Sequence, residues 1–131
     1  MKKILLDTNF LLIPYQFKVD IFSEIRRISD FKYRLCIVDK TIDELKKIIE
    51  KQKGKHMRAA ILGLAMLDMK KAQVIKSKEK NADEAIEKIA LKARKTYIVA
   101  TQDAELKRKL KKKGVSLIVL KGKAHLELLG N

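Results

Sequence analysis

The stretch Ile4-Leu5-Leu6-Asp7-Thr8-Asn9 decides how the rest of the chain is arranged. Three consecutive apolar residues are too few for a helix and are typical of a strand buried on both faces. Asp7 follows this strand directly, at the end where ligands bind in open α/β sheets. A carboxylate at such a place costs free energy unless it is paired or coordinated, so Asp7 is the first candidate functional residue.

Strand-like and helix-like segments alternate along the remaining chain. Further strands are expected at residues 33–38, 74–75, 97–100 and 115–120, and helices are expected to start near Asp20, Thr41, Met57, Asn81 and Asp103. The alternation predicts an α/β fold, a three-layer α/β/α sandwich around a mainly parallel sheet of about five strands. Residues 1–131 are enough for one domain with a proper core, and the tail after Leu120 is assigned no element.

Three more acids occupy similar positions. Asp103 follows a strand, while Glu44 and Asp83 start helices. Each has a structural alternative: Glu44 completes a capping box with Thr41, Asp83 sits where the helix dipole favours negative charge, and Asp103 caps the next helix. In an alternating fold, however, strand ends and helix starts lie along one edge of the sheet. All four acids therefore share that edge, and strand order, which the sequence does not give, decides whether they meet.

Four converging carboxylates repel one another unless some are protonated or a cation neutralises them. Oxygen ligands without a His or Cys cluster suit one or two Mg²⁺ or Mn²⁺ ions and not zinc, and His56 and His125 are expected to be surface or packing residues. A metal held by carboxylates activates water and stabilises charge on a phosphodiester. Asn9 and Thr101 lie beside the acids and are expected to support them by orienting water or phosphate.

The charge balance points to a polyanionic partner. The 131 residues include 31 Lys and Arg against 16 Asp and Glu, a formal charge of +15. Such a surface favours nucleic acid, although charge runs are also typical of solvated faces and of thermostable proteins. With only 5% aromatic residues, base stacking is not expected to dominate. The candidate RNA-binding residues adjoin two of the acids: Lys46, Lys47, Lys107, Arg108, Lys109, Lys111, Lys112 and Lys113.

The helix expected from Met57 to Lys71 is apolar around nearly its whole girth, which predicts burial on more than one side. In so small a domain this favours a homodimer interface over a central core helix. Asp7 interrupts the first apolar stretch too early for a secretory signal, and no apolar run reaches the length of a membrane span, so a cytoplasmic protein is expected. The single cysteine, Cys36, lies in an apolar run and is interpreted as a buried hydrophobe.

Four motifs in order resemble those of PIN-domain nucleases. ILLDTN at residues 4–9 resembles the opening strand motif, TIDEL at 41–45 the segment with the second acid, NADEAI at 81–86 the third, and ATQDAEL at 100–106 the Thr-x-Asp motif with the fourth. The resemblance covers essentially the whole chain. It implies a five-stranded α/β/α sandwich, one or two Mg²⁺ or Mn²⁺ ions, single-strand-specific RNA cleavage and, in many members, a homodimer.

By motif, the resemblance assigns metal binding and catalysis to Asp7, Glu44, Asp83 and Asp103, with Asn9 and Thr101 as supports. Residues 7–22 are more similar to the archaeal and eukaryotic ribosomal-RNA-processing branch than to bacterial-type toxins. The expected function is metal-dependent endoribonuclease activity on single-stranded or precursor RNA. Two alternatives stay open: the toxin of a pair with an antitoxin partner, and an inactive fold retained for RNA binding or assembly.

Overall fold

A six-stranded sheet forms the centre of the computed structural model, which describes residues 1–130. Its strand order is β3-β2-β1-β4-β5-β6. The strands are β1 (Lys2–Leu6), β2 (Tyr33–Val38), β3 (Gln73–Ile75), β4 (Tyr97–Ala100), β5 (Ser116–Lys121) and β6 (His125–Leu129). Every neighbouring pair is parallel except β5–β6. The predicted mainly parallel α/β fold is confirmed, with β6 added antiparallel in the tail to which no element was assigned.

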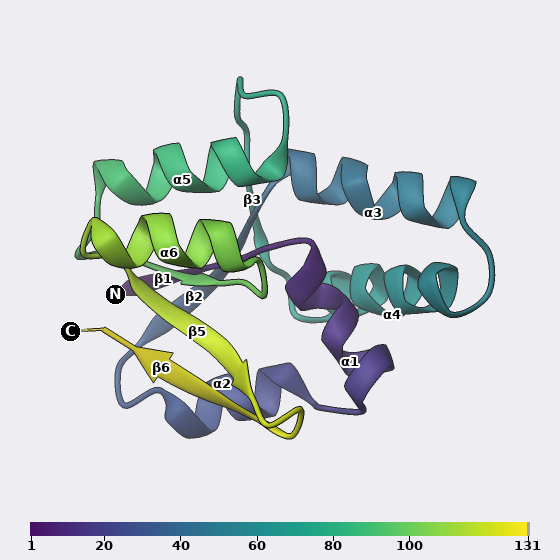
Figure 1. Ribbon diagram of the computed structural model, residues 1–131, viewed down its shortest axis with the longest axis horizontal. Helices are drawn as coiled ribbons and strands as arrows, with labels where there is room; N and C mark the ends of the chain where they lie inside the picture. Colours follow the sequence, from purple (N-terminus) through teal and green to yellow (C-terminus); the bar gives the residue numbers. More distant parts are fainter. Residues whose placement is uncertain (131) are drawn as a thin grey trace.

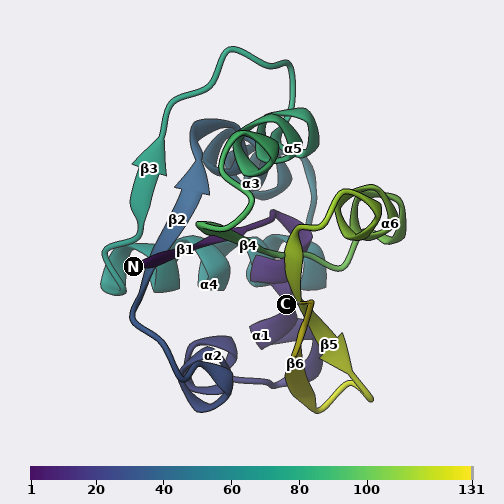
Figure 2. The same ribbon diagram turned by 90° about the vertical axis from the view of Figure 1, so that its left-hand side faces the viewer.

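Helices cover both faces of the sheet (Figures 1 and 2). They are the 3₁₀ turn η1 (Asn9–Leu12), α1 (Ile13–Phe17), α2 (Ile21–Ile28), α3 (Asp39–Lys51), α4 (Lys55–Met69), α5 (Ala82–Lys92) and α6 (Ala104–Lys112). Side chains of β1 alternate between the faces as a strand requires: Ile4 and Leu6 pack with α1, α2 and α4, and Leu5 packs with α5 and α6. The two resulting apolar layers hold β1 in the middle of the molecule.

The register places the ends of β1 and β4 side by side. Leu6 is paired with Ala100, the last residue of β4. The backbone N–H of Asp7 then donates to the carbonyl of Ala100 at 2.9 Å, one step beyond the end of β1. Asp7 and Thr101, the residues that follow the two strands, therefore emerge next to each other at the carboxyl edge of the sheet.

Two helix predictions are corrected. Thr41 does not cap its helix, because α3 already begins at Asp39 and Val38 occupies the N-cap. Thr41 is instead buried in the first turn, so Glu44 forms no capping box with it and is free for other contacts. The helix expected from Met57 to Lys71 runs over Lys55–Met69 and so begins two residues early, directly after its N-cap Gly54, whose φ is 69°.

Only one stripe of α4 is buried, and it consists of Ala59, Ala60, Gly63 and Leu67. The single chain covers only this stripe, since Ile61 is 47% exposed and Leu62 is 38% exposed, and the homodimer interface expected on the other side stays a prediction. Gly63 is required at the closest approach, because an added Cβ would lie 2.5 Å from the carbonyl oxygen of Leu11. The apolar girth of α4 thus leaves an uncovered face on the surface.

No helix within residues 1–130 combines the length and apolar character needed to cross a membrane.

Candidate active site

Asp7 and Thr101 form the floor of the candidate site. Asp7 is 2% exposed and Thr101 is fully buried. The Thr101 hydroxyl donates to Oδ2 of Asp7 at 2.7 Å, and the backbone N–H of Thr8 donates to Oδ1 at 2.8 Å. Both carboxylate oxygens of Asp7 are therefore oriented by fixed donors. The same Thr101 oxygen accepts from the N–H of Asp103 at 3.0 Å, which ties the end of β4 to the start of α6.

Glu44 reaches this floor from α3. Its Oε1 accepts from the hydroxyl of Thr8 at 2.6 Å, and its Oε2 accepts from the backbone N–H of Ala82 at 2.9 Å. Ala82 is the first residue of α5, whose N-terminal N–H groups lack partners inside the helix. Glu44 therefore joins β1, α3 and α5 at one point, which a capping-box role would not have done.

Asp83 and Asp103 complete the group from α5 and α6. Asp83 lies in the first turn of α5, after the N-cap Asn81, and is exposed. Asp103 is the N-cap of α6, and its Oδ1 accepts from the N–H of Leu106 at 2.8 Å. The structural roles considered for these two acids are thus real. These roles do not exclude a place in the site, because the starts of α5 and α6 lie at the shared edge of the sheet.

The pKa values show that the four acids interact. Burial raises the pKa of Asp7 to about 6, the hydrogen bond from Thr101 opposes this rise, and the charges of Asp83 and Glu44 add to it. The pKa of Asp83 is also raised, first by burial and then by the charges of Asp103 and Glu44, while Lys109 lowers it. Asp7 and Asp83 therefore each carry an electrostatic cost from neighbouring carboxylates, which a bound cation would reduce.

The donors fit a hard divalent cation in their chemistry. All are carboxylate oxygens, as Mg²⁺ and Mn²⁺ prefer. Among residues 1–130, no three His, Cys, Asp or Glu side chains stand close enough together to hold an ion as they are. No donor in that part of the chain bonds the exposed carboxylate of Asp83. Asp83 is therefore the member free to turn toward a cation, whereas Asp7 and Glu44 are fixed.

Three residues support the acids, and each does so through different hydrogen bonds. Thr101 orients Asp7 through its hydroxyl. Oδ1 of Asn9 accepts a hydrogen bond from the backbone N–H of Gln102 at 3.2 Å, which holds the loop before Asp103 in place. The residue that sequence reasoning missed is Thr8, which donates to Asp7 through its N–H and to Glu44 through its hydroxyl. A polar side chain directly after a buried strand needs a partner, and that requirement was the available signal.

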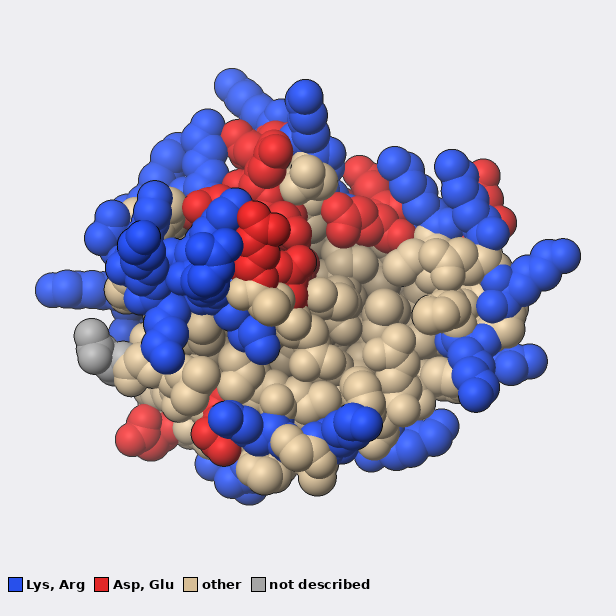
Figure 3. Space-filling model, in the orientation of Figure 1, with Lys and Arg blue, Asp and Glu red and all other residues tan. Residues whose placement is uncertain are grey.

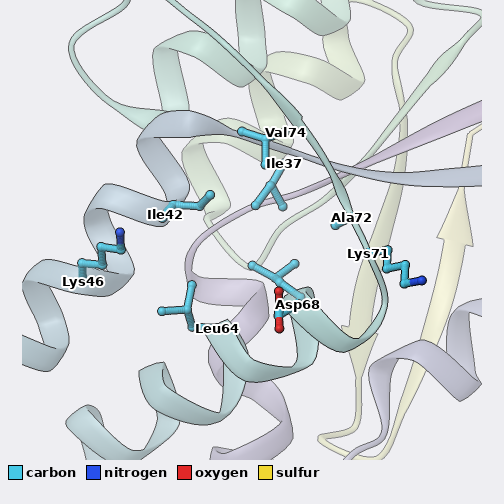
Figure 4. Close-up of a pocket in the computed structure, with 9 residues that line it drawn as sticks. Ile37, Ile42, Lys46, Leu64, Asp68, Lys71, Ala72 and Val74 are labelled. Carbon is cyan, nitrogen blue, oxygen red and sulfur yellow. The ribbon is translucent and has the colours of Figure 1, made fainter.

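The candidate RNA-binding residues lie on two sides of the acids. Figure 3 shows Lys and Arg side chains over α6 directly beside the acidic patch. The α6 region carries Lys107, Arg108, Lys109, Lys111, Lys112 and Lys113. On α3, Lys46 and Lys47 follow Glu44 within one turn. Lys46 lines a mostly apolar pocket of about 400 Å³ with Ile42 and Leu64 (Figure 4), and none of the four acids lines that pocket.

Comparisons with known proteins agree with the fold. Residues 4–123 match the family described as PIN like domain. Ribonuclease VapC4 of Methanocaldococcus jannaschii is 32% identical over 130 residues, covering 99% of this chain and 98% of the relative.

Two solved structures share the fold. The PIN domain endonuclease Utp24 has a TM-score of 0.78 and 22% identity, covering 98% of this chain and 92% of that one. A domain of a functionally unknown protein from M. jannaschii has a TM-score of 0.59 and 19% identity, covering 93% of each chain. The family match over nearly the whole length and the 32% identical relative lead to one conclusion: this chain belongs to the PIN-like domain family.

Proposed function

We propose that this protein is a divalent-metal-dependent endoribonuclease that hydrolyses phosphodiester bonds in single-stranded or precursor RNA. The observation that carries the proposal is the electrostatic interaction of the acids at this edge of the sheet: burial, and then the charges of Asp83 and Glu44, raise the pKa of Asp7, and burial, and then the charges of Asp103 and Glu44, raise that of Asp83. The ribonuclease name of the 32% identical relative supports the same reaction class. The neighbouring basic α6 suits a polyanionic substrate.

Asp7, Glu44, Asp83 and Asp103 are the residues that would hold Mg²⁺ or Mn²⁺, as one or two ions. When bound, such an ion supplies an activated water and charge stabilisation at the phosphate. The chain's own part is to fix the ligands: Thr101 and Thr8 hold Asp7, Thr8 and the N–H of Ala82 hold Glu44, and Asn9 fixes the loop that carries Asp103. This prearrangement would place the ligand oxygens before the ion binds.

The proposed biological role is ribosomal-RNA processing, on the resemblance of residues 7–22. The second candidate is a toxin that acts with an antitoxin partner and uses the same chemistry. The 32% identical relative, which is named ribonuclease VapC4, supports this candidate. Expression in a host separates the two: a toxin arrests growth and its gene has a small antitoxin gene beside it, whereas a processing enzyme leaves growth intact.

We also propose a cytoplasmic homodimer joined through α4. The exposed apolar residues of that helix support this, above all Ile61, Leu62 and Met69, which is 76% exposed. Exposed apolar side chains that share one face are typical of an interface.

Replacement of a single ligand tests the proposed chemistry. Asp83→Asn removes a charge from the acidic group, while Glu84→Gln removes the next carboxylate in the same exposed first turn of α5. Labelled single-stranded RNA is incubated with each variant in Mn²⁺ or in EDTA. We expect Asp83→Asn to reduce cleavage by about a hundredfold or more and Glu84→Gln to cleave at nearly the wild-type rate.

Equal cleavage by the two variants would remove Asp83 from the site. Cleavage that persists in EDTA would instead refute metal dependence. Full RNA binding without cleavage in any metal would favour the inactive, RNA-binding alternative.

A further inference from the structure

A basic groove of about 260 Å³ lies between α6 and the β5–β6 hairpin, separate from the acidic group. Lys107, Arg108 and Lys111 line it from α6 and Lys121 lines it from β5, together with apolar residues that include Val119 and Leu129. Figure 2 shows α6 and this hairpin on the same side of the molecule. Four cations thus surround one narrow apolar surface.

None of these four cations is neutralised by a carboxylate within residues 1–130. The ion pair on α6 in that part of the chain joins Nζ of Lys109 to Glu105 at 3.4 Å, and neither residue lines the groove. Lys109 also faces Asp83, whose pKa it lowers. The cations of α6 therefore divide into the groove residues, Lys109, which pairs with Glu105, and the exposed Lys112 and Lys113, which do not line the groove.

The groove starts close to the acidic group. Asp103 is the N-cap of α6, so Lys107 and Lys111 lie one and two turns further along the helix. At 1.5 Å per residue these positions are about 6 and 12 Å from Asp103 along the helix axis. A linear polyanion lying in the groove therefore points toward the carboxylates at its near end.

We propose that this groove binds the sugar-phosphate backbone of the RNA strand on one side of the bond to be cleaved. The inference rests on the proposed function and extends it, because it selects four cations from a surface on which basic residues are common. Spaced charges from α6 and β5 match the repeating phosphates of a single strand, and the apolar lining accepts sugar and base surfaces without selecting a sequence. An acidic peptide also matches the charge. The proposed reaction at the carboxylates, however, cleaves a phosphodiester, which only a nucleic acid carries.

Salt-dependent binding tests the assignment. The probe is a fluorescein-labelled oligouridylate of roughly twelve nucleotides, measured by fluorescence anisotropy in EDTA so that no metal-dependent cleavage occurs. The groove variant is Lys107→Gln/Lys111→Gln. The matched control is Lys92→Gln/Arg94→Gln, which removes the same charge from exposed residues that do not line the groove.

Each lost phosphate contact lowers the slope of log K against log salt by about 0.7 for a single strand. We expect the groove variant to lose about 1.4 units of slope, equivalent to about 25-fold in affinity over the decade from 1 M to 0.1 M salt. The control should stay within about twofold of wild type, because exposed charges away from the strand are screened. Lys121→Gln, on β5, should lose about 0.7 units by itself.

Equal losses in the two double variants would overturn the proposal, because net charge alone would then explain binding. An unchanged groove variant would also overturn it and leave an acidic peptide as the better occupant. If wild type cleaves RNA in Mn²⁺ but binds it independently of the groove, only this inference fails. If wild type neither binds nor cleaves the oligonucleotide, the proposed function fails with it.

Discussion

Replacing Asp7 by Asn should stabilise the metal-free protein at neutral pH. Burial raises the pKa of Asp7 from 3.8 to about 6, so the folded protein holds this proton more tightly than the unfolded chain does. Ionising Asp7 therefore costs the folded state free energy, and stability falls as the pH rises from about 4 to about 6. The shift of about two pKa units corresponds to a destabilisation of the folded state by about 3 kcal/mol. This destabilisation is complete above roughly pH 7 and nearly absent at pH 4.

The substituted asparagine would not recover the full amount. Its amide would offer one acceptor where the carboxylate of Asp7 now accepts from the N–H of Thr8 and from the hydroxyl of Thr101. One imperfect hydrogen bond costs about 1 kcal/mol, which leaves a net gain of about 2 kcal/mol at neutral pH. For a chain of this size that gain raises the melting temperature by roughly 6–10 °C.

The assay is urea unfolding in EDTA at about pH 4 and about pH 8, with Asp43→Asn as control. Asp43 is an exposed carboxylate, so its replacement should change the free energy of unfolding by less than about 0.5 kcal/mol at either pH. The reasoning is refuted if Asp7→Asn gains no stability at pH 8, or if its difference from wild type is the same at both pH values.

Three further outcomes are expected. Mn²⁺ should raise the melting temperature of wild type and of Thr8→Ser, but much less that of Thr8→Val, because valine has no hydroxyl to donate to Oε1 of Glu44; equal shifts would show that Thr8 does not position Glu44. Gly63→Ala should cost more than about 2 kcal/mol in urea unfolding, because its Cβ would press on the backbone oxygen of Leu11; a cost below about 1 kcal/mol would mean that α4 shifts freely. Leu62→Glu should convert a dimer into a monomer in sedimentation equilibrium, and the dimer proposal fails if wild type is already monomeric.

The sequence predicted the edge of the site because an alternating fold fixes where strand ends and helix starts lie. It did not predict which strands are neighbours. The adjacency of β1 and β4 is what brings the hydroxyl of Thr101 to Asp7, and it arises from contacts between residues 94 positions apart. Local patterns carry no information at that separation.

Local patterns were also ambiguous where two explanations share one spacing. Thr41 and Glu44 have the spacing of a capping box, yet α3 starts at Asp39 with Val38 as its N-cap, and Glu44 accepts from Thr8 and Ala82 instead. The apolar girth of α4 was correctly recognised as unusual, but its outward half is exposed in the single chain. The residues of β6 were assigned no element; this strand forms by antiparallel pairing with β5, which the local pattern does not reveal.

The cations of α6 show the same limit. All six residues carry the same charge in the sequence, so they were predicted together as RNA-binding. Only the packing of α6 against the β5–β6 hairpin separates Lys107 and Lys111 from Lys112 and Lys113. That separation is a property of the tertiary structure.

The most direct test of the central claim is cleavage of a panel of single-stranded RNAs by wild type and Asp7→Asn, each in Mn²⁺ and in EDTA. The account predicts cutting by wild type in Mn²⁺ alone, and none by Asp7→Asn, even though that variant is the more stable protein and binds RNA nearly as well. Cutting by Asp7→Asn at a rate near that of wild type, or cutting that survives EDTA, would contradict a metal site built on Asp7.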